Sequence, residues 1–316
     1  MDAWKPEVMV VGGGVVGLTT AIRLVERGRR VRIVTAEPAE RTTSAAASAM
    51  WSLPPVAPDD PQLRWARASL PELQSLAATA GTGVHLARGV LASRVDGPLP
   101  PVMTTIPGFR PIAGGLPAGF REGFQVEVPL LDMPPYLRYL TARFGGGGGE
   151  LQVRRLASLA EAAAEAPVIV NCAGVAARDL VPDPLVHPVF GQHVLVENPG
   201  LTDFFMEGPR VSEWVGIYPY DDHVVLGGVA VPDRWEREPD PSLAARIVDR
   251  CVEVEPRLRG ARVLGHNAGL RPARPAVRLE VTDLAGARCV HNYGHGTLGV
   301  GLAWGCAAEA AELAAG

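Results

Sequence analysis

Residues 8–37 read VMVVGGGVVGLTTAIRLVERGRRVRIVTAE, and this stretch decides the fold of the chain. Its first apolar run, 8–11, is typical of a parallel strand that is buried on both faces. Apolar side chains then recur with helical spacing until Gly28, where we expect the helix to end. A second buried strand is expected at 31–35. The stretch therefore predicts a strand, a helix and a second strand parallel to the first.

The turn between the first strand and the helix carries glycines in the spacing G-x-G-x-x-G. Gly12 suits a tight turn, Gly14 lets a pyrophosphate approach the backbone, and Gly17 lets the helix lie close to the strand. Glu37 ends the second strand, where an acidic side chain accepts hydrogen bonds from adenosine ribose hydroxyls. This order of elements favours a dinucleotide site over a ligand-free turn. It leaves NAD, NADP and FAD as alternatives.

A second glycine-rich turn lies near the end of the chain, where residues 289–313 read CVHNYGHGTLGVGLAWGCAAEAAEL. We expect a short strand, the turn and an Ala-rich helix, whose first N–H groups are left open to an electron-rich ligand. Just before it, residues 269–280 read GLRPARPAVRLE and place arginines in a proline-stiffened segment. Together the two stretches predict a place for a cofactor ring beside fixed positive charge.

The middle of the chain has a different pattern. Residues 83–130 and 186–228 read as short strands with turns, which is typical of an antiparallel sheet. The five glycines at 145–149 are expected to form a flexible surface loop. The predicted fold class is therefore α/β: a Rossmann-like cofactor domain with an inserted, mainly antiparallel β-sheet substrate domain. We assign residues 1–80, 132–185 and 265–316 to the first domain, and 81–131 and 186–264 to the second.

Composition limits the kinds of partner. The chain has 316 residues, 47% of them hydrophobic, which is enough for a large core and two domains. Its net charge is -4 and its basic residues are scattered, so neither nucleic acid nor a membrane is expected as a partner. The 4 cysteines are widely spaced, without metal-ligand or disulfide spacing, which favours the cytoplasm and no metal. High Ala, Gly, Pro and Arg content is typical of a GC-rich bacterial genome.

Sequence blocks from one end of the chain to the other resemble the D-amino-acid oxidases, FAD flavoenzymes of the glutathione-reductase-like nucleotide fold. In chain order the blocks are VVGGGVVGLTTAIRL, RTTSAAASAMW, PVIVNCAGVAARDL, FGQHVLV, VVLGG, GLRPARPAVRLE and HNYGHGTLGVGLAWGCAAEAA. The resemblance implies FAD as the cofactor. It also implies that a D-amino acid gives a hydride from Cα to flavin N5, and that the imine hydrolyses to a 2-oxo acid and ammonia. Oxygen then takes the electrons and becomes hydrogen peroxide.

The resemblance further implies individual site residues. Arg271 is expected to bind the substrate α-carboxylate as a bidentate ion pair, with Tyr218 and Thr297 also at the substrate. Arg274 and Arg278 are expected to form structural pairs or to act on the flavin electrostatically. The expected FAD contacts are Val11, Gly12, Gly14, Val15, Val16, Glu37, Arg41, Thr42, Thr43, Ser48, Ala49, Met50, Leu156, Gly296, Thr297, Leu298, Gly299 and Gly301.

No side chain is expected to act as a catalytic acid or base, because hydride transfer from a neutral amine requires none. His295 is therefore expected to pack beside the flavin. Cys172 is expected to be a small core residue.

One departure from the family pattern concerns the substrate. The family places a tyrosine in Y-[IV]-[IV]-P, and the aligned residue here is Gly216. Tyr218 lies two positions further on, on the same face of the strand, and is the better substitute than Tyr220. Loss of one hydrogen bond to a charged group costs about 1.5 to 3 kcal/mol of binding. Residues 204–214, where mammalian members carry a lid, are also short.

Two alternatives therefore stay open. One is a related flavin amine oxidase specialised for a cyclic imino acid or a secondary-metabolite substrate. The other is a catalytically weak flavoprotein that acts as a binding module. The expected partners are a small amino-acid substrate and molecular oxygen, and a homodimer is left open.

Overall fold

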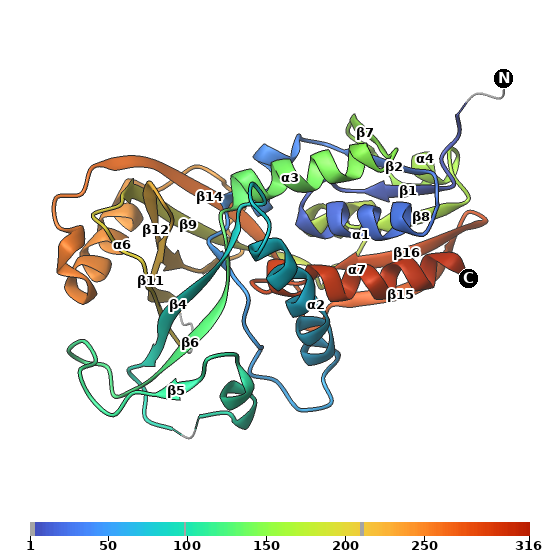
Figure 1. Ribbon diagram of the computed structural model, residues 1–316. Coiled ribbons are helices and arrows are strands. Elements are labelled where there is room, and N and C mark those ends of the chain that lie inside the picture. The colour runs from blue at the N-terminus through green and yellow to red at the C-terminus, as the bar shows by residue number, and fades with distance from the viewer. Residues whose placement is uncertain (1–3, 98, 209–211) are drawn as a thin grey trace.

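Two β-sheets organise the chain, one in each half of the molecule (Figure 1). The computed structural model describes residues 4–97, 99–208 and 212–316. Within them, a 6-stranded sheet has the order β15-β16-β8-β1-β2-β7, and a 10-stranded sheet has the path β13-β9-β12-β11-β10-β4-β6-β3. In that second sheet β14 also pairs with β9, and β5 pairs with β6.

The helices and strands of the 6-stranded half begin with the predicted strand–helix–strand unit. Its strands are β1 (Val8–Val11), β2 (Val31–Thr35), β7 (Glu150–Val153), β8 (Val168–Asn171), β15 (Arg278–Leu284) and β16 (Ala287–Tyr293). Its helices are α1 (Val15–Glu26), α2 (Pro61–Ala77), α3 (Met133–Gly146), α4 (Leu159–Ala163), α5 (Ala177–Leu180) and α7 (Gly299–Ala315).

The alternation along β1 shows how this sheet is buried on both faces. Val8 and Val10 join the core formed with α1, α3 and α7, while Met9 and Val11 join a second core that includes Leu159 of α4. β1 pairs in parallel with β2 and with β8, as predicted for a sheet covered by helices on both sides. α7 packs against α1 and α2, which brings the C-terminal turn beside the first glycine turn.

The second half is a mainly antiparallel sheet, which packs against α6 (Pro241–Val254) through a separate core and, through β4 and β6, against α2 as part of the main core. Its strands are β3 (Ala49–Met50), β4 (Val84–Ser93), β5 (Arg110–Pro111), β6 (Glu122–Leu131), β9 (His187–Glu197), β10 (Phe204–Glu207), β11 (Glu213–Pro219), β12 (His223–Val229), β13 (Val231–Pro232) and β14 (Val263–Ala273). One pair, β10 with β4, is parallel. The predicted fold class, a Rossmann-like domain with an inserted β-sheet domain, is confirmed.

Sheet membership differs from the predicted division at two places. Residues 49–50, assigned to the first domain, form β3, which pairs with β6 of the second sheet. The proposed boundary at 265 falls inside β14, which pairs with β9 from Val263 to Ala273. The chain passes between the sheets after Ala273, because Arg278 already pairs with Tyr293 in the other sheet. The boundary depends on which distant strands pair with one another, so the local sequence pattern did not reveal it.

The five-glycine run is not the free loop that its composition predicts. Gly146 is the last residue of α3, and a Cβ on Gly147 would lie 2.7 Å from Val25 of α1. A Cβ on Gly149 would lie 2.1 Å from the ring of Phe144. Gly147 and Gly149 therefore let the chain turn closely against α1 and the end of α3, whereas a Cβ on Gly145, Gly146 or Gly148 would meet nothing within 4 Å, and the run lies at the surface as predicted.

Candidate cofactor and substrate site

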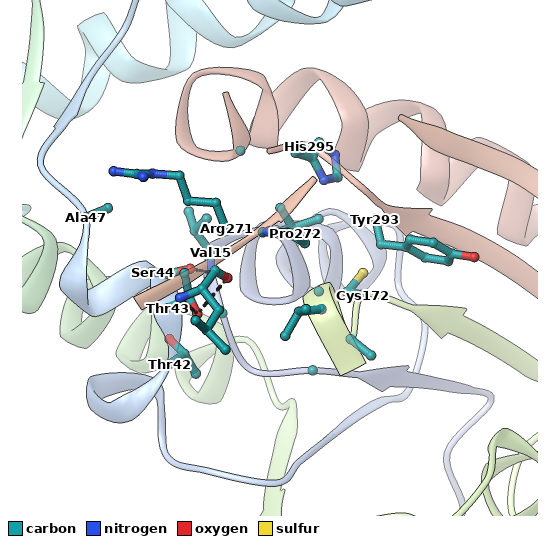
Figure 2. A pocket seen from close by; sticks show the side chains of 18 of the residues that line it. Val15, Thr42, Thr43, Ser44, Ala47, Cys172, Arg271, Pro272, Tyr293 and His295 are labelled. Atoms are coloured by element: carbon teal, nitrogen blue, oxygen red, sulfur yellow. Dashed lines mark hydrogen bonds between the residues drawn. The ribbon is translucent and has the colours of Figure 1, made fainter. Parts of the chain in front are cut away.

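A cavity of about 650 Å³ lies where the two halves meet. Side chains from separate segments gather around it: Val15, the 42–47 stretch, Arg271 with Pro272, and His295 (Figure 2). β1, β2 and β14 reach it with their C-terminal ends, and α1 and α7 with their N-terminal ends. This is the usual ligand position outside the carboxyl ends of parallel strands.

The first glycine turn is shaped by close backbone contacts. Gly12 has φ +113°, and a Cβ there would lie 2.3 Å from the carbonyl oxygen of Cys172. A Cβ on Gly17 would lie 1.9 Å from the carbonyl oxygen of Gly12, so only glycine lets α1 lie this close. A Cβ on Gly14 would lie 2.9 Å from Ser44 Oγ, which accepts a hydrogen bond from the Val15 N–H at 3.0 Å. The turn thus exposes the positive end of α1 to the cavity, which suits a pyrophosphate.

Two buried polar atoms beside the cavity have no hydrogen-bond partner in the described part of the chain. Asn292 Oδ1 and His295 Nε2 find no hydrogen-bond partner among the described residues, although both side chains are buried and line the cavity. Leaving such an atom unsatisfied costs about 1 to 3 kcal/mol. Together with the bare glycine turn and the cavity volume, these atoms fit a flavin dinucleotide.

Burial decides the charge state of the other groups here. It lowers the pKa of His295 to about 4, so the imidazole is neutral at pH 7. It raises the pKa of the Cys172 thiol to about 12, so a reactive thiolate is not available. Both findings agree with packing roles for these side chains.

Arg271 lies on β14 at the other end of the cavity, flat against a glycine. A Cβ on Gly191 of β9 would lie 2.3 Å from Arg271 Cζ. Arg271 Nη1 donates to the carbonyl oxygens of Val229 at 2.9 Å and Phe190 at 3.4 Å. Its Cζ is 5.7 Å from the ring centroid of Trp214, which is within range of a cation–π interaction. The guanidinium is therefore held in one orientation.

The same pattern recurs along the sheet, so we call Gly191, Gly216, Gly227 and Gly228 the glycine floor. A Cβ on Gly228 would lie 2.1 Å from Trp214, and one on Gly227 would lie 2.6 Å from His193. Four side chains, Arg271, Tyr218, His193 and Trp214, thus occupy the space in which a side chain on one of these glycines would begin. Gly216 pairs directly with Gly227, so β11 and β12 share the floor.

Tyr218 and Gly216 are two parts of one feature. A Cβ on Gly216 would lie 2.8 Å from Tyr218 Cε2 and 3.1 Å from its hydroxyl oxygen. The phenol ring therefore leans back over Gly216 and fills the space in which a side chain at 216 would begin. The glycine at 216, where the family has a tyrosine, thus makes room for the ring of Tyr218.

His193 is a buried neighbour of Arg271 that the sequence did not single out. Its Nδ1 is 2.8 Å from the Ala46 carbonyl oxygen, which can only accept, so Nδ1 carries the proton. Its Nε2 then accepts from the Ser48 hydroxyl at 2.9 Å. Burial first, and the Arg271 charge second, lower the pKa of His193 to about 4. The imidazole stays neutral and fixes the direction of the Ser48 hydroxyl.

Arg274 and Arg278 are engaged in structural pairs, one of the two expected roles. Arg274 Nε lies 3.1 Å from Asp183 Oδ2, and Arg278 Nη1 donates to the Tyr293 hydroxyl at 2.7 Å. That hydroxyl donates to Asp183 at 2.8 Å. Both arginines are thus occupied by the buried Asp183 carboxylate and its tyrosine.

Most of the predicted site residues line the cavity together. The structure brings to it Val11, Gly12, Gly14, Val15, Val16, Glu37, Thr42, Thr43, Ser48, Ala49, Met50, Leu156, Tyr218, Arg271, Gly296, Thr297, Leu298, Gly299 and Gly301. Arg41, the last residue of a 3-10 turn (Ala39–Arg41), instead lines an adjoining cavity. Its contact with the cofactor stays a prediction, as do the roles of the other residues.

Sequence reasoning missed several lining residues, namely Met206, Trp214, His193 and Arg237. They come from strands and loops of the second half, where the alternating pattern does not show which face meets the cofactor. Residues 209–211 of the short 204–214 segment lie outside the described residues. The paired glycines of LGG at 226–228 were the one available signal for close approach.

Fold and site define the class of a flavin-dependent oxidoreductase with an inserted β-sheet domain. A model of the family described as "DAO: FAD dependent oxidoreductase" matches residues 7–106 and 110–313. The chain belongs to this D-amino-acid oxidase family of FAD-dependent enzymes, and FAD is its cofactor.

Similar proteins cover nearly the whole length of the chain. It is 49% identical to a D-amino-acid oxidase of Streptomyces coelicolor, over 99% of this chain and 98% of that protein. It is 48% identical to a D-amino-acid oxidase of Rubrobacter xylanophilus, over 97% and 95%. The crystal structure of glycine oxidase from Geobacillus kaustophilus shares the fold, with a TM-score of 0.83 at 17% identity over 99% and 95%.

None of the helices in the described part of the chain is long and apolar enough to cross a membrane.

Proposed function

We propose that the chain oxidatively deaminates a D-amino acid to a 2-oxo acid, ammonia and hydrogen peroxide. The observation that carries the proposal is the Arg271 guanidinium, held flat on Gly191 beside Trp214 within the cofactor cavity. A planar cation in a fixed orientation matches a carboxylate, which it binds through two parallel hydrogen bonds. The two relatives at 48% and 49% identity, both D-amino-acid oxidases, support the same substrate class.

FAD, when bound, supplies the acceptor for the hydride that leaves the substrate Cα. The chain's own residues position the substrate for this step. Arg271 binds the α-carboxylate, and the Tyr218 hydroxyl, which leans over Gly216, donates a further hydrogen bond to it. The open N-terminus of α7, with Thr297 before it, lies at the cofactor side of the cavity.

No side chain is assigned a proton transfer. His193 and His295 have pKa values of about 4, so each stays neutral near pH 7. The substrate reacts with its amine neutral, and the imine is hydrolysed by water after it leaves. Fixed geometry, rather than acid–base chemistry, is what the site contributes.

The experiment is anaerobic reduction of the bound flavin by a panel of D-amino acids. We expect D-alanine, D-proline or D-methionine to bleach the flavin absorption of the wild type, and their L-enantiomers to leave it unchanged. Arg271→Ala should bind FAD but bleach slowly, with a raised KM. Arg262→Ala, which removes an exposed arginine paired with Glu197, is the matched control. A full rate in Arg271→Ala would disprove the carboxylate role.

A second candidate is an amine oxidase specialised for a cyclic imino acid or a secondary-metabolite substrate. Gly216 favours it, because the usual tyrosine position carries no side chain. A flavin that stays oxidised across the primary D-amino acids but bleaches with a cyclic secondary amine would select this candidate. A protein that binds FAD and is reduced by none of these compounds would act as a binding module instead.

We further propose that molecular oxygen is the electron acceptor and that the enzyme works in the cytoplasm. Oxygen consumption with stoichiometric peroxide, measured with the reducing D-amino acid, tests the acceptor. Cell fractionation tests the location, and sedimentation of the holoenzyme tests whether it forms a homodimer.

A further inference from the structure

Arg237 reaches from the substrate half of the molecule to the cofactor half. It lies in the segment between β13 and α6, yet its Nη1 donates to both Glu37 carboxylate oxygens, at 2.9 and 3.0 Å. Its Nη2 donates to the carbonyl oxygen of Arg41. One side chain thus joins two points of the 37–41 segment across a sequence separation of about 200 residues.

This contact lies at the adenosine end of the cavity. Glu37 directly follows β2, and both Glu37 and Arg237 line the main cavity. Arg237 also borders the adjoining cavity with Arg41 and Pro239. The wall of the cofactor site at this end is therefore completed by a residue of the other half.

Glu37 can hold Arg237 and a ribose at the same time. A carboxylate offers about four lone-pair positions, and Arg237 uses one on each oxygen. The remaining positions can accept from the two hydroxyls of a ribose. The guanidinium also orients the carboxylate before the cofactor arrives, which lowers the entropy that binding must remove.

Charge gives a second reason for the contact. FAD brings a doubly negative pyrophosphate to the first glycine turn, and the Glu37 carboxylate adds another negative charge nearby. Arg237 offsets the Glu37 charge. Its side chain is 40% exposed and that of Glu37 is 33% exposed, and surface ion pairs of this kind contribute little to folding stability. We therefore expect the contact to contribute more to the affinity for FAD than to the free energy of unfolding.

We propose that Arg237 is a cofactor latch, which orients Glu37 for the adenosine ribose and fastens the substrate half over the bound FAD. The inference rests on the proposed place of the ribose at Glu37. Coupling is reciprocal, so bound FAD also strengthens the contact between the two halves. The latch slows the escape of FAD from the adenosine end.

The test measures FAD binding to the FAD-free protein, by the change in flavin fluorescence on titration and by the rate of FAD release. We expect Arg237→Gln to raise the Kd for FAD about tenfold, mainly through faster release. The Kd of Arg237→Lys should lie between those of the wild type and of Arg237→Gln. Arg262→Gln, which breaks the exposed pair with Glu197, is the control and should leave both quantities unchanged. Unchanged Kd and release rate in Arg237→Gln would overturn the proposal.

A double-mutant cycle identifies the route of the effect. In a Glu37→Ala background, Arg237→Gln should weaken FAD binding much less than in the wild type, because only the contact with the Arg41 carbonyl oxygen is left to lose. An equally large loss in that background would overturn the latch through Glu37. A lower unfolding temperature of FAD-free Arg237→Gln with unchanged FAD affinity would show a structural contact only. None of these measurements uses a substrate, so the latch stands or fails separately from the proposed reaction.

Discussion

Substituting Gly191 by alanine should move the Arg271 guanidinium without disturbing the fold. The new Cβ would lie 2.3 Å from Arg271 Cζ, 2.3 Å from Nη2 and 2.4 Å from Nη1. Ordinary contact begins near 3.4 Å, so the guanidinium must shift by about 1 Å. The clashing atoms are the far end of the flexible Arg271 side chain. Gly191 is also not among the residues that have a positive φ. The strand itself can therefore accept alanine.

The expected loss follows from the hydrogen bonds that orient Arg271. A shift of this size breaks the 2.9 Å bond to the Val229 carbonyl and tilts the fork away from its carboxylate ligand. Loss of one hydrogen bond to a charged group costs about 1.5 to 3 kcal/mol. The affinity for a carboxylate should fall roughly ten- to hundredfold.

The assay is titration of the FAD-loaded protein with benzoate, a carboxylate without an amine, followed by the flavin absorption. Gly265→Ala on β14 is the matched control, because a Cβ there meets nothing within 4 Å. Both variants should keep full FAD and a wild-type unfolding temperature. Wild-type benzoate affinity in Gly191→Ala would refute the glycine-floor argument.

Three further predictions test other parts of the structure. Burial lowers the pKa of His193 and His295 to about 4, so below pH 6.5 the unfolded chain takes up protons that the folded chain does not. The unfolding temperature of the FAD-free protein should fall from pH 6.5 towards pH 4, and less steeply in His295→Phe; an identical slope in that variant would contradict the assignment. Gly17→Ala should lower the free energy of unfolding by about 3 kcal/mol or more, because its Cβ would lie 1.9 Å from a backbone oxygen. Gly145→Ala in α3 is the control, because its Cβ meets nothing within 4 Å and should not destabilise the protein. Chemical denaturation of the two variants measures the difference. Tyr218→Phe should weaken benzoate about tenfold and leave FAD binding intact; unchanged benzoate affinity would remove its hydroxyl from the site.

The cofactor half was predictable because its signals are local. Strand, glycine turn, helix and terminal acid lie within residues 8–37, and Gly13 and Gly17 are required by contacts inside that unit, whereas Gly12 and Gly14 meet Cys172 and Ser44. The turn before α7 likewise carries its glycine pattern within a short stretch, residues 294–301. Local signals failed where distant contacts decide the conformation, as at residues 145–149 and at the change of sheet after Ala273.

The sequence by itself determined the strand–helix–strand unit, the fold class, and most of the residues that meet at the cavity. Arg271 also came from the sequence, through its resemblance to a family motif. Only the tertiary structure decided how Arg271 is held, because Gly191 lies on β9 and Trp214 and Tyr218 lie on β11, and these strands are brought together through β12.

The contact of Arg237 with Glu37 was likewise decided only by the tertiary structure. A periodic pattern reports which face of one element is buried. Which side chain lies on which glycine, or which arginine reaches which carboxylate, depends on how the two halves pack together.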